Sequence, residues 1–516
     1  MPNASPFVLQ PGALRLADLH GLWREARPVE VDSSAWPRVE AALAAVRRVM
    51  EHDRTVYGVN TGFGSLARTH IHRDDLAELQ HRLVRSHSSG FGEPLPRRVV
   101  RMTLLLKIGS LARGHSGVRR EVIDMLAALL NADALPVLPN QGSVGASGDL
   151  APLAHMSASL IGEGEVDLKG DRMPAEQALS RLGLRPLTLE AKEGLALLNG
   201  TQVSTALGLE GLFRAYDLCG AALVAGAMSV DAALGSDVPF DPRIHEVRGQ
   251  PGQIAAARVL ARLIAGSGIR ASHLDCDRVQ DPYSLRCQPQ VMGAVLDTLQ
   301  AAAGMLEREA NAVSDNPLVF PQEDDILSGG NFHAEPVGFA ADMIALAIAE
   351  TGAISERRIA MLTDARMSEL PPFLVPEPGL NSGFMLAHVT AAALASETKQ
   401  MSHPAVVDSL PTSANQEDHV SMATHGACRL GRMADNVGGV LAIELLAAAQ
   451  GIDLRRPLHS SEPLEKAHAR IRDHAAFMAE DRSLAPAMSS IARAVASGWF
   501  LEEIVGANAL PGLSAD

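Results

Sequence analysis

The most informative stretch of the chain is residues 142–155, which read Gly142-Ser143-Val144-Gly145-Ala146-Ser147-Gly148-Asp149-Leu150-Ala151-Pro152-Leu153-Ala154-His155. Its first eight residues include three glycines and two serines and carry almost no side-chain bulk. Asp149 can cap a helix, and Pro152 is tolerated only in a first helical turn. The sequence therefore predicts a loop whose backbone can be compressed, followed directly by a helix.

The tripeptide Ala146-Ser147-Gly148 is the candidate for backbone strain, which tends to be stored at functional sites. If the amide nitrogen of Gly148 is forced onto the carbonyl carbon of Ala146, a five-membered ring closes. Loss of water there and from Ser147 leaves an exocyclic methylene group, which is a strong electrophile. Glycine suits the attacking position because a side chain would crowd the ring.

Two other interpretations of this loop stay open on its residues alone. A flexible turn before a helix is the ordinary one, and glycines ahead of a helix N-terminus also cradle phosphate groups. No Gly-Lys-Ser or Gly-Lys-Thr follows, however, and no expected strand with a later acidic residue completes a dinucleotide fingerprint. Nucleotide binding is therefore not expected.

Composition and charge favour a soluble helical protein. The 516 residues carry 45 Lys and Arg against 60 Asp and Glu, and the net charge of −15 repels nucleic acid and anionic membranes. Aromatic residues make up only 3%, whereas the helix formers alanine and leucine dominate. Neither a nucleic acid nor a membrane is expected as a partner.

The expected location is the cytoplasm. The N-terminus lacks the basic region and apolar run of a secretory signal. Residues 218–230 are uncharged but too short to span a bilayer, and residues 378–396 are interrupted by polar side chains. The cysteines lack the paired spacing of a metal site or a disulfide framework, and this fits free thiols in a reducing compartment. They are Cys219, Cys276, Cys287 and Cys428.

Helical periodicity runs through most of the chain. Early helices are expected over 36–51, 75–88, 95–113 and 118–131, the second with Gly90 as a C-cap. Residues 162–186 read as a small hairpin or excursion. Longer apolar stripes follow over 291–306, 337–349 and 420–445. The sequence thus predicts a mainly α fold, with a domain over residues 1–200 that carries the glycine-rich loop and a long helical bundle over residues 201–516.

Polar clusters interrupt these helices at 280–287, 314–317, 329–336 and 412–419. Residues 57–64 are too glycine-rich for a helix or strand and carry Tyr57, one of three tyrosines. This segment is either an ordinary surface turn or a loop that closes over a ligand. Glu417 and His419 could suggest a metal, but no second spaced pair of ligands accompanies them, so no metal is expected.

Together these segments resemble the aromatic amino acid ammonia-lyases. The similarity extends from about residue 11 to about residue 454 and rests on motifs in the family's order at 57–64, 142–155, 197–202, 280–292, 330–336 and 412–422. The resemblance implies an ammonia-lyase and fumarase type of fold. It also implies a methylidene-imidazolone group (MIO) formed autocatalytically from Ala146, Ser147 and Gly148, and a homotetramer whose active sites are shared between subunits.

The resemblance also implies roles for individual side chains. Tyr57 is the expected base, with a pKa lowered by its neighbours, and Arg286 is expected to grip the substrate carboxylate. The other implied residues hold the electrophile or surround the substrate: Asn199 and Tyr283 hold both, Gln280 lines the carboxylate end, Phe332 borders the pocket, and Glu417 binds the substrate ring or shuttles a proton.

Substrate choice is expected to depend on Ser86, His87 and Glu417. Relatives that deaminate phenylalanine or tyrosine typically carry Phe-Leu or His-Leu at the first two sites and glutamine at the third. A phenyl ring would leave His87 and Glu417 without hydrogen-bond partners. Buried polar groups without partners make binding less favourable. The expected reaction is therefore the elimination of ammonia from L-histidine to give trans-urocanate, the first step of histidine degradation. An aminomutase, or a lyase for another aromatic amino acid, is the alternative.

Overall fold

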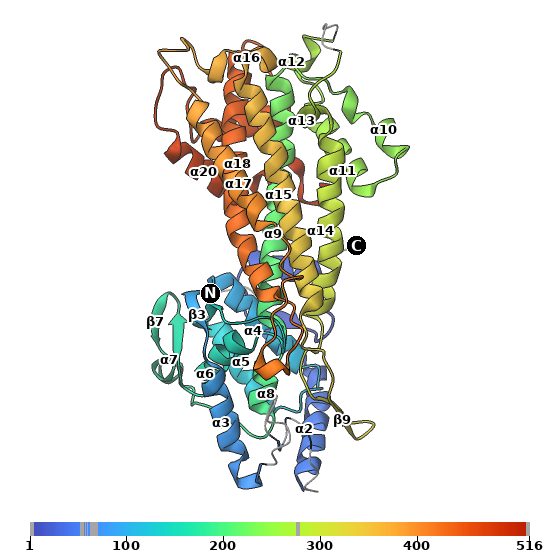
Figure 1. The fold of residues 1–516 in the computed structure, drawn as a ribbon, viewed down its shortest axis with the longest axis vertical. Helices are drawn as coiled ribbons and strands as arrows, with labels where there is room; N and C mark the ends of the chain where they lie inside the picture. Colours follow the sequence, from blue (N-terminus) through green and yellow to red (C-terminus); the bar gives the residue numbers. More distant parts are fainter. Residues whose placement is uncertain are drawn as a thin grey trace.

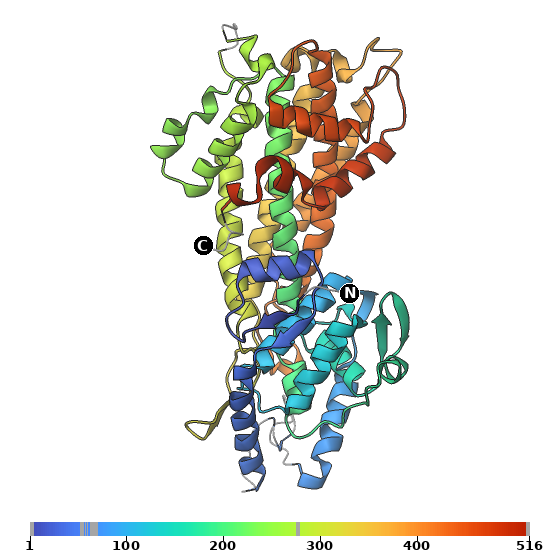
Figure 2. The ribbon, with the colours of Figure 1, turned by 180° about the vertical axis from the view of Figure 1, so that it is seen from behind.

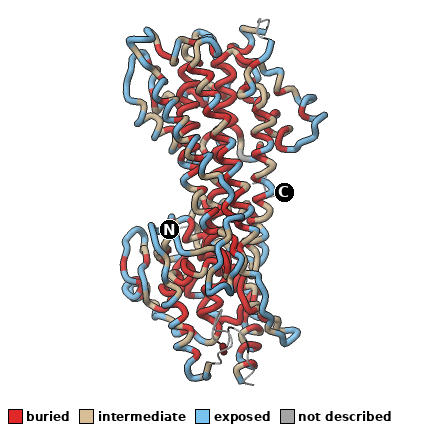
Figure 3. Tube along the Cα trace, viewed as in Figure 1, coloured by how far each residue is buried: buried red, intermediate tan, exposed pale blue. Residues whose placement is uncertain are grey.

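A computed structural model of the chain describes residues 5–51, 56, 58, 60, 61, 71–274 and 279–511. The molecule is elongated, with long helices along its long axis and the early part of the chain gathered at one end (Figure 1). The fold is mainly α, which confirms the expected class. Buried residues run through the full length of the helical part (Figure 3).

Four long helices form the bundle: α9 (Gln202–Ala232), α14 (Gln288–Ala310), α15 (Glu335–Thr363) and α18 (Ala423–Leu454). They run side by side in both views (Figures 1 and 2), and α9 packs most extensively against α18. Small residues allow this approach, since a Cβ on Gly211 of α9 would lie 2.4 Å from Leu430 Cδ1 of α18. The three apolar stripes predicted after residue 200 therefore correspond to α14, α15 and α18.

Shorter helices surround this bundle: α10 (Pro242–Glu246), α11 (Pro251–Ile264), α12 (Gly268–Ala271), α13 (Tyr283–Arg286), α16 (Ala365–Ser368), α17 (Met385–Met401), α19 (Glu462–Arg472) and α20 (Ala485–Ala496). Helix α9 begins at Gln202, close to the predicted division at residue 200. That division into two domains stays a prediction.

The early chain contributes α1 (Leu16–Arg24), α2 (Trp36–Glu51), α3 (Leu76–His87), α4 (Arg97–Leu111), α5 (Arg120–Ala132), α6 (Leu150–Leu160), α7 (Ala175–Arg181) and α8 (Glu193–Leu198). Helix α2 has the predicted bounds, and α3, α4 and α5 lie within about two residues of theirs. The predicted C-cap at Gly90 is wrong. Helix α3 ends at His87, and Ser88 is its C-cap with a negative φ of −74°.

Small sheets complete this part. Parallel strands β1 (Phe7–Leu9) and β2 (Val29–Val31) pair, and antiparallel pairing joins β3 (Phe91–Pro94) to β5 (Pro139–Gln141) and β8 (Leu318–Phe320) to β9 (Asp325–Leu327). Strand β4 (Ala134–Pro136) pairs with β6 (Glu165–Leu168), which pairs with β7 (Asp171–Pro174). The β6–β7 hairpin confirms the one expected within residues 162–186; the other short strands lack an alternating pattern and were not predicted.

Two bundle helices, α15 and α18, are long and apolar enough to cross a membrane by length and composition. Most of each apolar segment is buried, 72% in α15 and 83% in α18. Both helices pack against α9 in the middle of the bundle. Their apolar character is accounted for by their central position.

A fully buried ion pair lies between two of the central helices. Arg358 of α15 and Glu444 of α18 are both inaccessible to solvent, and Arg358 Nη2 donates to Glu444 Oε2 over 2.9 Å. Ser229 of α9 donates to the other carboxylate oxygen over 2.8 Å, and Ser355 donates to Oε2 over 2.6 Å. One carboxylate therefore links three bundle helices.

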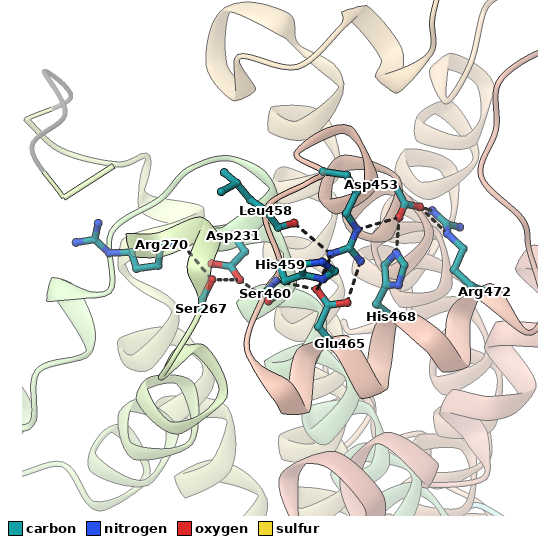
Figure 4. Close-up of polar contacts among 11 residues, drawn as sticks. Asp231, Ser267, Arg270, Asp453, Leu458, His459, Ser460, Glu465, His468 and Arg472 are labelled. Atoms are coloured by element: carbon teal, nitrogen blue, oxygen red, sulfur yellow. Dashed lines mark hydrogen bonds and ion pairs between the residues drawn. The ribbon is translucent and has the colours of Figure 1, made fainter. Parts of the chain in front are cut away.

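A second polar network connects helices at the end of the bundle that lies far from the N-terminal part of the chain (Figure 4). Buried Asp231, near the end of α9, accepts hydrogen bonds from Ser267, which precedes α12, and from Ser460, which precedes α19. Within the later segment, Asp453 accepts from His468 and Arg472, each over 2.8 Å. These contacts hold the C-terminal helices against the end of α9.

We predict that Glu444→Gln lowers the free energy of unfolding by about 3–5 kcal/mol, because the guanidinium of Arg358 is left buried without a counter-charge. The urea midpoint at fixed protein concentration measures this loss. Glu397→Gln on the exposed face of α17, where Glu397 lies 3.3 Å from Arg432, is the matched control and should change stability by less than about 1 kcal/mol. Equal midpoints for the two variants would contradict the role given to the buried pair.

Candidate active site

The glycine-rich loop, residues 142–149, lies where the early chain meets the bundle. It connects β5 to α6, and two distant segments bind its backbone. Met422 N donates to Val144 O over 2.9 Å, and Ala334 N donates to Gly145 O over 3.2 Å. Met422 and Ala334 are the N-cap residues of α18 and α15. The loop is thus anchored by the starts of two bundle helices.

Close packing at two positions of the loop requires glycine. Gly145 has a φ of +67° and Gly148 a φ of +75°, a region that side chains rarely adopt. A Cβ on Gly145 would lie 2.2 Å from Ser421 Oγ, and one on Gly148 would lie 2.2 Å from the carbonyl oxygen of Gly200. Gly148 and Gly200 approach closely enough to form a parallel β-bridge.

Asp149 has a different role from the one predicted. It occupies the N-cap position of α6, but its side chain makes no capping hydrogen bond there. Instead Oδ2 accepts from Ser204 N over 2.8 Å and from Ser204 Oγ over 3.0 Å, while Oδ1 accepts from Thr424 Oγ1 over 2.6 Å and Ser143 Oγ over 3.1 Å. Ser204 and Thr424 lie in the first turns of α9 and α18, where helix dipoles favour negative charge. Burial raises the pKa of Asp149, and these hydrogen bonds oppose that shift.

Ser147 is held from two sides. Its hydroxyl donates to Glu417 Oε1 over 2.8 Å, and its carbonyl oxygen accepts from Asn199 Nδ2 over 3.2 Å. Glu417 is fixed in turn because Thr412 Oγ1 donates to its Oε2 over 2.7 Å. The structure therefore brings Asn199 and Glu417 onto the tripeptide that was singled out as reactive.

A cavity of about 300 Å³ opens beside Ser147. Its walls come from the end of α3, the glycine-rich loop, the start of α6 and the segment before α18: Ser86, His87, Ser89, Gly142, Ser143, Val144, Ala146, Ser147, Gly148, Leu150, Ala151, Thr412, Ser413 and Glu417. The three residues expected to choose the substrate therefore line the same cavity as Ser147: Ser86, His87 and Glu417.

The orientation of His87 follows from its hydrogen bonds. Its Nδ1 lies 2.9 Å from the carbonyl oxygen of Leu83. Because a carbonyl only accepts, Nδ1 carries the proton, and Nε2 is an acceptor while the ring is neutral. Burial lowers the pKa of His87, although the Leu83 carbonyl and the charge of Glu417 act in the opposite direction. The neutral ring is therefore favoured.

Three expected residues lie far from this cavity within one chain. Tyr283 and Arg286 belong to α13, and Gln280 precedes it; Figure 1 places α13 at the opposite end of the bundle from α6 and α8. Tyr283 is 71% exposed, and the Arg286 guanidinium stacks on its ring at 4.5 Å. The chain by itself does not bring these side chains to Ser147.

The last two expected residues are Tyr57 and Phe332. Tyr57 lies outside the described residues. Its neighbour Gly58 is described, and a Cβ there would lie 2.5 Å from Leu195 Cδ2 of α8. Phe332 is partly buried two residues before Ala334, whose amide binds the glycine-rich loop.

Some residues around the site were missed by sequence reasoning. Thr412, Ser421 and Thr424 position the loop or Glu417 through hydroxyl groups, which carry no distinctive pattern in sequence. Lys107 is also buried behind Asn199 and donates to its carbonyl oxygen. A signal for Lys107 existed, since it is the one charged residue in the apolar run 104–108.

Comparison with known proteins agrees with this geometry. Residues 14–473 match the family described as aromatic amino acid lyase. The chain is 60% identical to the histidine ammonia-lyase of Burkholderia pseudomallei over 494 residues, which are 96% of this chain and 97% of the relative. The chain belongs to the aromatic amino acid lyase family.

Solved structures of this lyase family have the same fold. The histidine ammonia-lyase of Trypanosoma cruzi is 41% identical and superposes with a TM-score of 0.89, covering 98% of this chain and 97% of its own. A tyrosine aminomutase from Streptomyces globisporus is 34% identical with a TM-score of 0.91, covering 96% and 98%. Because an ammonia-lyase and an aminomutase share this fold, the fold alone does not select one reaction.

For this lyase we predict that Gly148→Ala disrupts the loop, because the added Cβ would meet the Gly200 carbonyl oxygen, a backbone atom that cannot rotate away. Activity should fall by at least about 100-fold, in line with the cost of displacing reacting groups by about 1 Å. The matched control is Gly170→Ala, which also has a positive φ, +102°, but nothing within 4 Å of the new Cβ. Similar activity in both variants would show that close packing at Gly148 is unimportant.

Proposed function

We propose that this lyase is a histidine ammonia-lyase that eliminates ammonia from L-histidine without oxidation and releases trans-urocanate, the first step of histidine degradation. The observation that carries the proposal is the cavity in which Ser147, His87 and Glu417 meet. The 60% identity to a histidine ammonia-lyase supports it over nearly the whole chain. The enzyme is expected to act in the cytoplasm.

The residues of the loop fit the MIO group that the family resemblance implies. Cyclisation needs a glycine at 148, and the backbone there leaves no space for a side chain. The hydroxyl that must leave belongs to Ser147. It donates to the Glu417 carboxylate, and the Ser147 carbonyl oxygen accepts from the side-chain amide of Asn199. When formed, the group supplies an electrophile that ordinary side chains lack, which eases expulsion of a poor leaving group.

Glu417 gives a physical reason for histidine as the substrate. Its Oε1 accepts the Ser147 hydroxyl in the open chain, and loss of that hydroxyl frees Oε1 to accept an N–H from the substrate. An imidazole offers such an N–H, whereas a phenyl ring does not. The neutral His87 presents Nε2 in the same cavity as a second polar contact.

The remaining roles require more than one copy of the chain. In the proposed homotetramer, α13 of a second copy brings Gln280, Tyr283 and Arg286 to the cavity, where Arg286 binds the substrate carboxylate with two hydrogen bonds. Exposed apolar side chains on the bundle support such packing: Phe339 and Leu346 on α15, and Leu386 and Val389 on α17. Tyr57 would act as the base and Phe332 would border the ring.

The nearest alternative is an aminomutase, which returns ammonia to the β-carbon of the amino acid. It is considered because a tyrosine aminomutase shares the fold at 34% identity. The two reactions differ in product. Incubation with L-histidine should release urocanate and free ammonia in equal amounts; accumulation of a β-amino acid would support the mutase.

We predict that Ser147→Ala abolishes urocanate formation while the fold is retained, because alanine has no hydroxyl to lose. Urocanate absorbance measures activity, and circular dichroism checks the fold. Ser413→Ala is the control, since Ser413 lines the same cavity but lies outside the tripeptide. Near-normal activity of Ser147→Ala would remove the electrophile from the mechanism.

We also predict that His87→Leu combined with Glu417→Gln shifts preference from histidine toward phenylalanine. Loss of two polar contacts should lower kcat/KM for histidine by at least about 30-fold, because each unmet polar group costs about 1–3 kcal/mol and about 1.4 kcal/mol corresponds to a factor of ten. The ratio of kcat/KM values for the two substrates measures the shift, with each single variant as a control. An unchanged ratio would place substrate choice elsewhere.

A further inference from the structure

Behind the site lies a lysine that the reaction does not use. Lys107 of α4 is only 1% exposed, and its ammonium group donates to the carbonyl oxygens of Asn199 over 2.6 Å and Ala196 over 3.1 Å. These carbonyls belong to the last turn of α8 and to its C-cap, where a helix leaves acceptors unpaired. A cation is favoured there by the helix dipole.

The contacts of Lys107 lead directly to the reactive tripeptide. Asn199, held through its carbonyl oxygen, donates from Nδ2 to the carbonyl oxygen of Ser147 over 3.2 Å. The next residue, Gly200, accepts from Asp149 N over 2.8 Å and forms the β-bridge with Gly148. The side-chain nitrogen of Lys107 therefore holds the segment 199–200, and this segment in turn contacts residues 147–149.

The charges around Lys107 set it apart from an ordinary buried ion pair. Burial lowers the pKa of Lys107 to about 7, and Asp315, Asp149 and Lys192 are the charged groups that act on it. Asp315 is already paired, because Lys192 Nζ lies 2.6 Å from its Oδ2. Among the described residues, no carboxylate lies within ion-pair distance of Lys107 itself. Burying an ammonium group without a direct counter-charge is costly, so binding the two carbonyls is what this residue does here.

We propose that Lys107 is a positioning residue that presses the 199–200 segment against the loop so that Ala146-Ser147-Gly148 can cyclise. The inference rests on the proposed function, since it concerns formation of the MIO group. In that step a bond forms between Gly148 N and the Ala146 carbonyl carbon. The carbonyl oxygen leaves as water with the amide hydrogens of Gly148 and Ser147, and the Ser147 hydroxyl leaves as a second water with the Cα hydrogen.

The direct test is the intact mass of the purified, denatured full-length chain, because cyclisation removes two waters whether or not the enzyme is assayed. Lys107→Met keeps an unbranched apolar side chain that is one atom shorter and removes the donors. Most of this variant should keep the uncyclised mass while retaining wild-type circular dichroism. Its kcat should fall in proportion to the uncyclised fraction, whereas KM of the remaining active sites should stay unchanged.

Lys192→Met is the matched control. Lys192 is also fully buried, but it binds Asp315 and not Asn199. This variant should lose at least as much stability as Lys107→Met and still cyclise. Equal loss of cyclisation in both variants would attribute the effect to any buried charge and overturn the proposal, as would a fully cyclised Lys107→Met protein.

If Lys107→Met is insoluble, Lys107→Gln provides the test with a neutral donor that can reach one carbonyl. A cyclised fraction below that of the wild type supports the positioning role, and complete cyclisation overturns it. The mass of the wild-type protein separates this inference from the proposed function. If the wild-type protein is active but has the uncyclised mass, the MIO group is not part of the mechanism. If both the wild type and Lys107→Met have the cyclised mass, only the role of Lys107 is contradicted.

Discussion

The structure around the active site depends on one buried carboxylate, that of Asp149. Its two oxygens accept four hydrogen bonds, and their donors join the glycine-rich loop to the first turns of α9 and α18. A buried carboxylate is stable only when its oxygens are satisfied, so the loop and both helix starts must be in place together. Formation of the bundle and placement of the reactive tripeptide are therefore parts of the same event.

This arrangement explains how a glycine-rich and therefore flexible sequence is held in one conformation. Glycines at 145 and 148 lower the conformational energy of a positive φ. They do not enforce it, because glycine can adopt many other backbone conformations. Selection comes from outside the loop, through Ser421 and the N-cap residues of α15 and α18 on one face and Gly200 on the other. The positive φ angles of Gly145 and Gly148 are therefore held by contacts with Gly200 and with the starts of α15 and α18.

The sequence predicted the long helices and singled out Ser147, Asn199 and Glu417, which the structure brings into contact, but it did not predict the other contacts around them. Apolar periodicity located the long helices, because burial of one face or of the whole helix leaves a pattern in sequence. The loop and Glu417 were found through motifs. The role of Asp149 was missed because its partners Ser204 and Thr424 lie 55 and 275 residues away, and a local cap was the simpler reading. Lys107 could have been noticed as the one charged residue in the apolar run 104–108, but its partners are backbone carbonyls, which no side-chain pattern reveals.

The elongated bundle also separates the two halves of the proposed site. The cavity lies at the starts of α9 and α18, whereas Arg286 lies beside the far end of α9, which the Asp231 network holds in place (Figures 1 and 4). Straight, tightly packed helices cannot bend far enough to bring these ends together. In the proposed assembly, a second copy packed along the bundle brings Arg286 to the cavity that Glu417 lines. In the proposed assembly, the rigidity that supports the loop therefore makes association a condition of substrate binding.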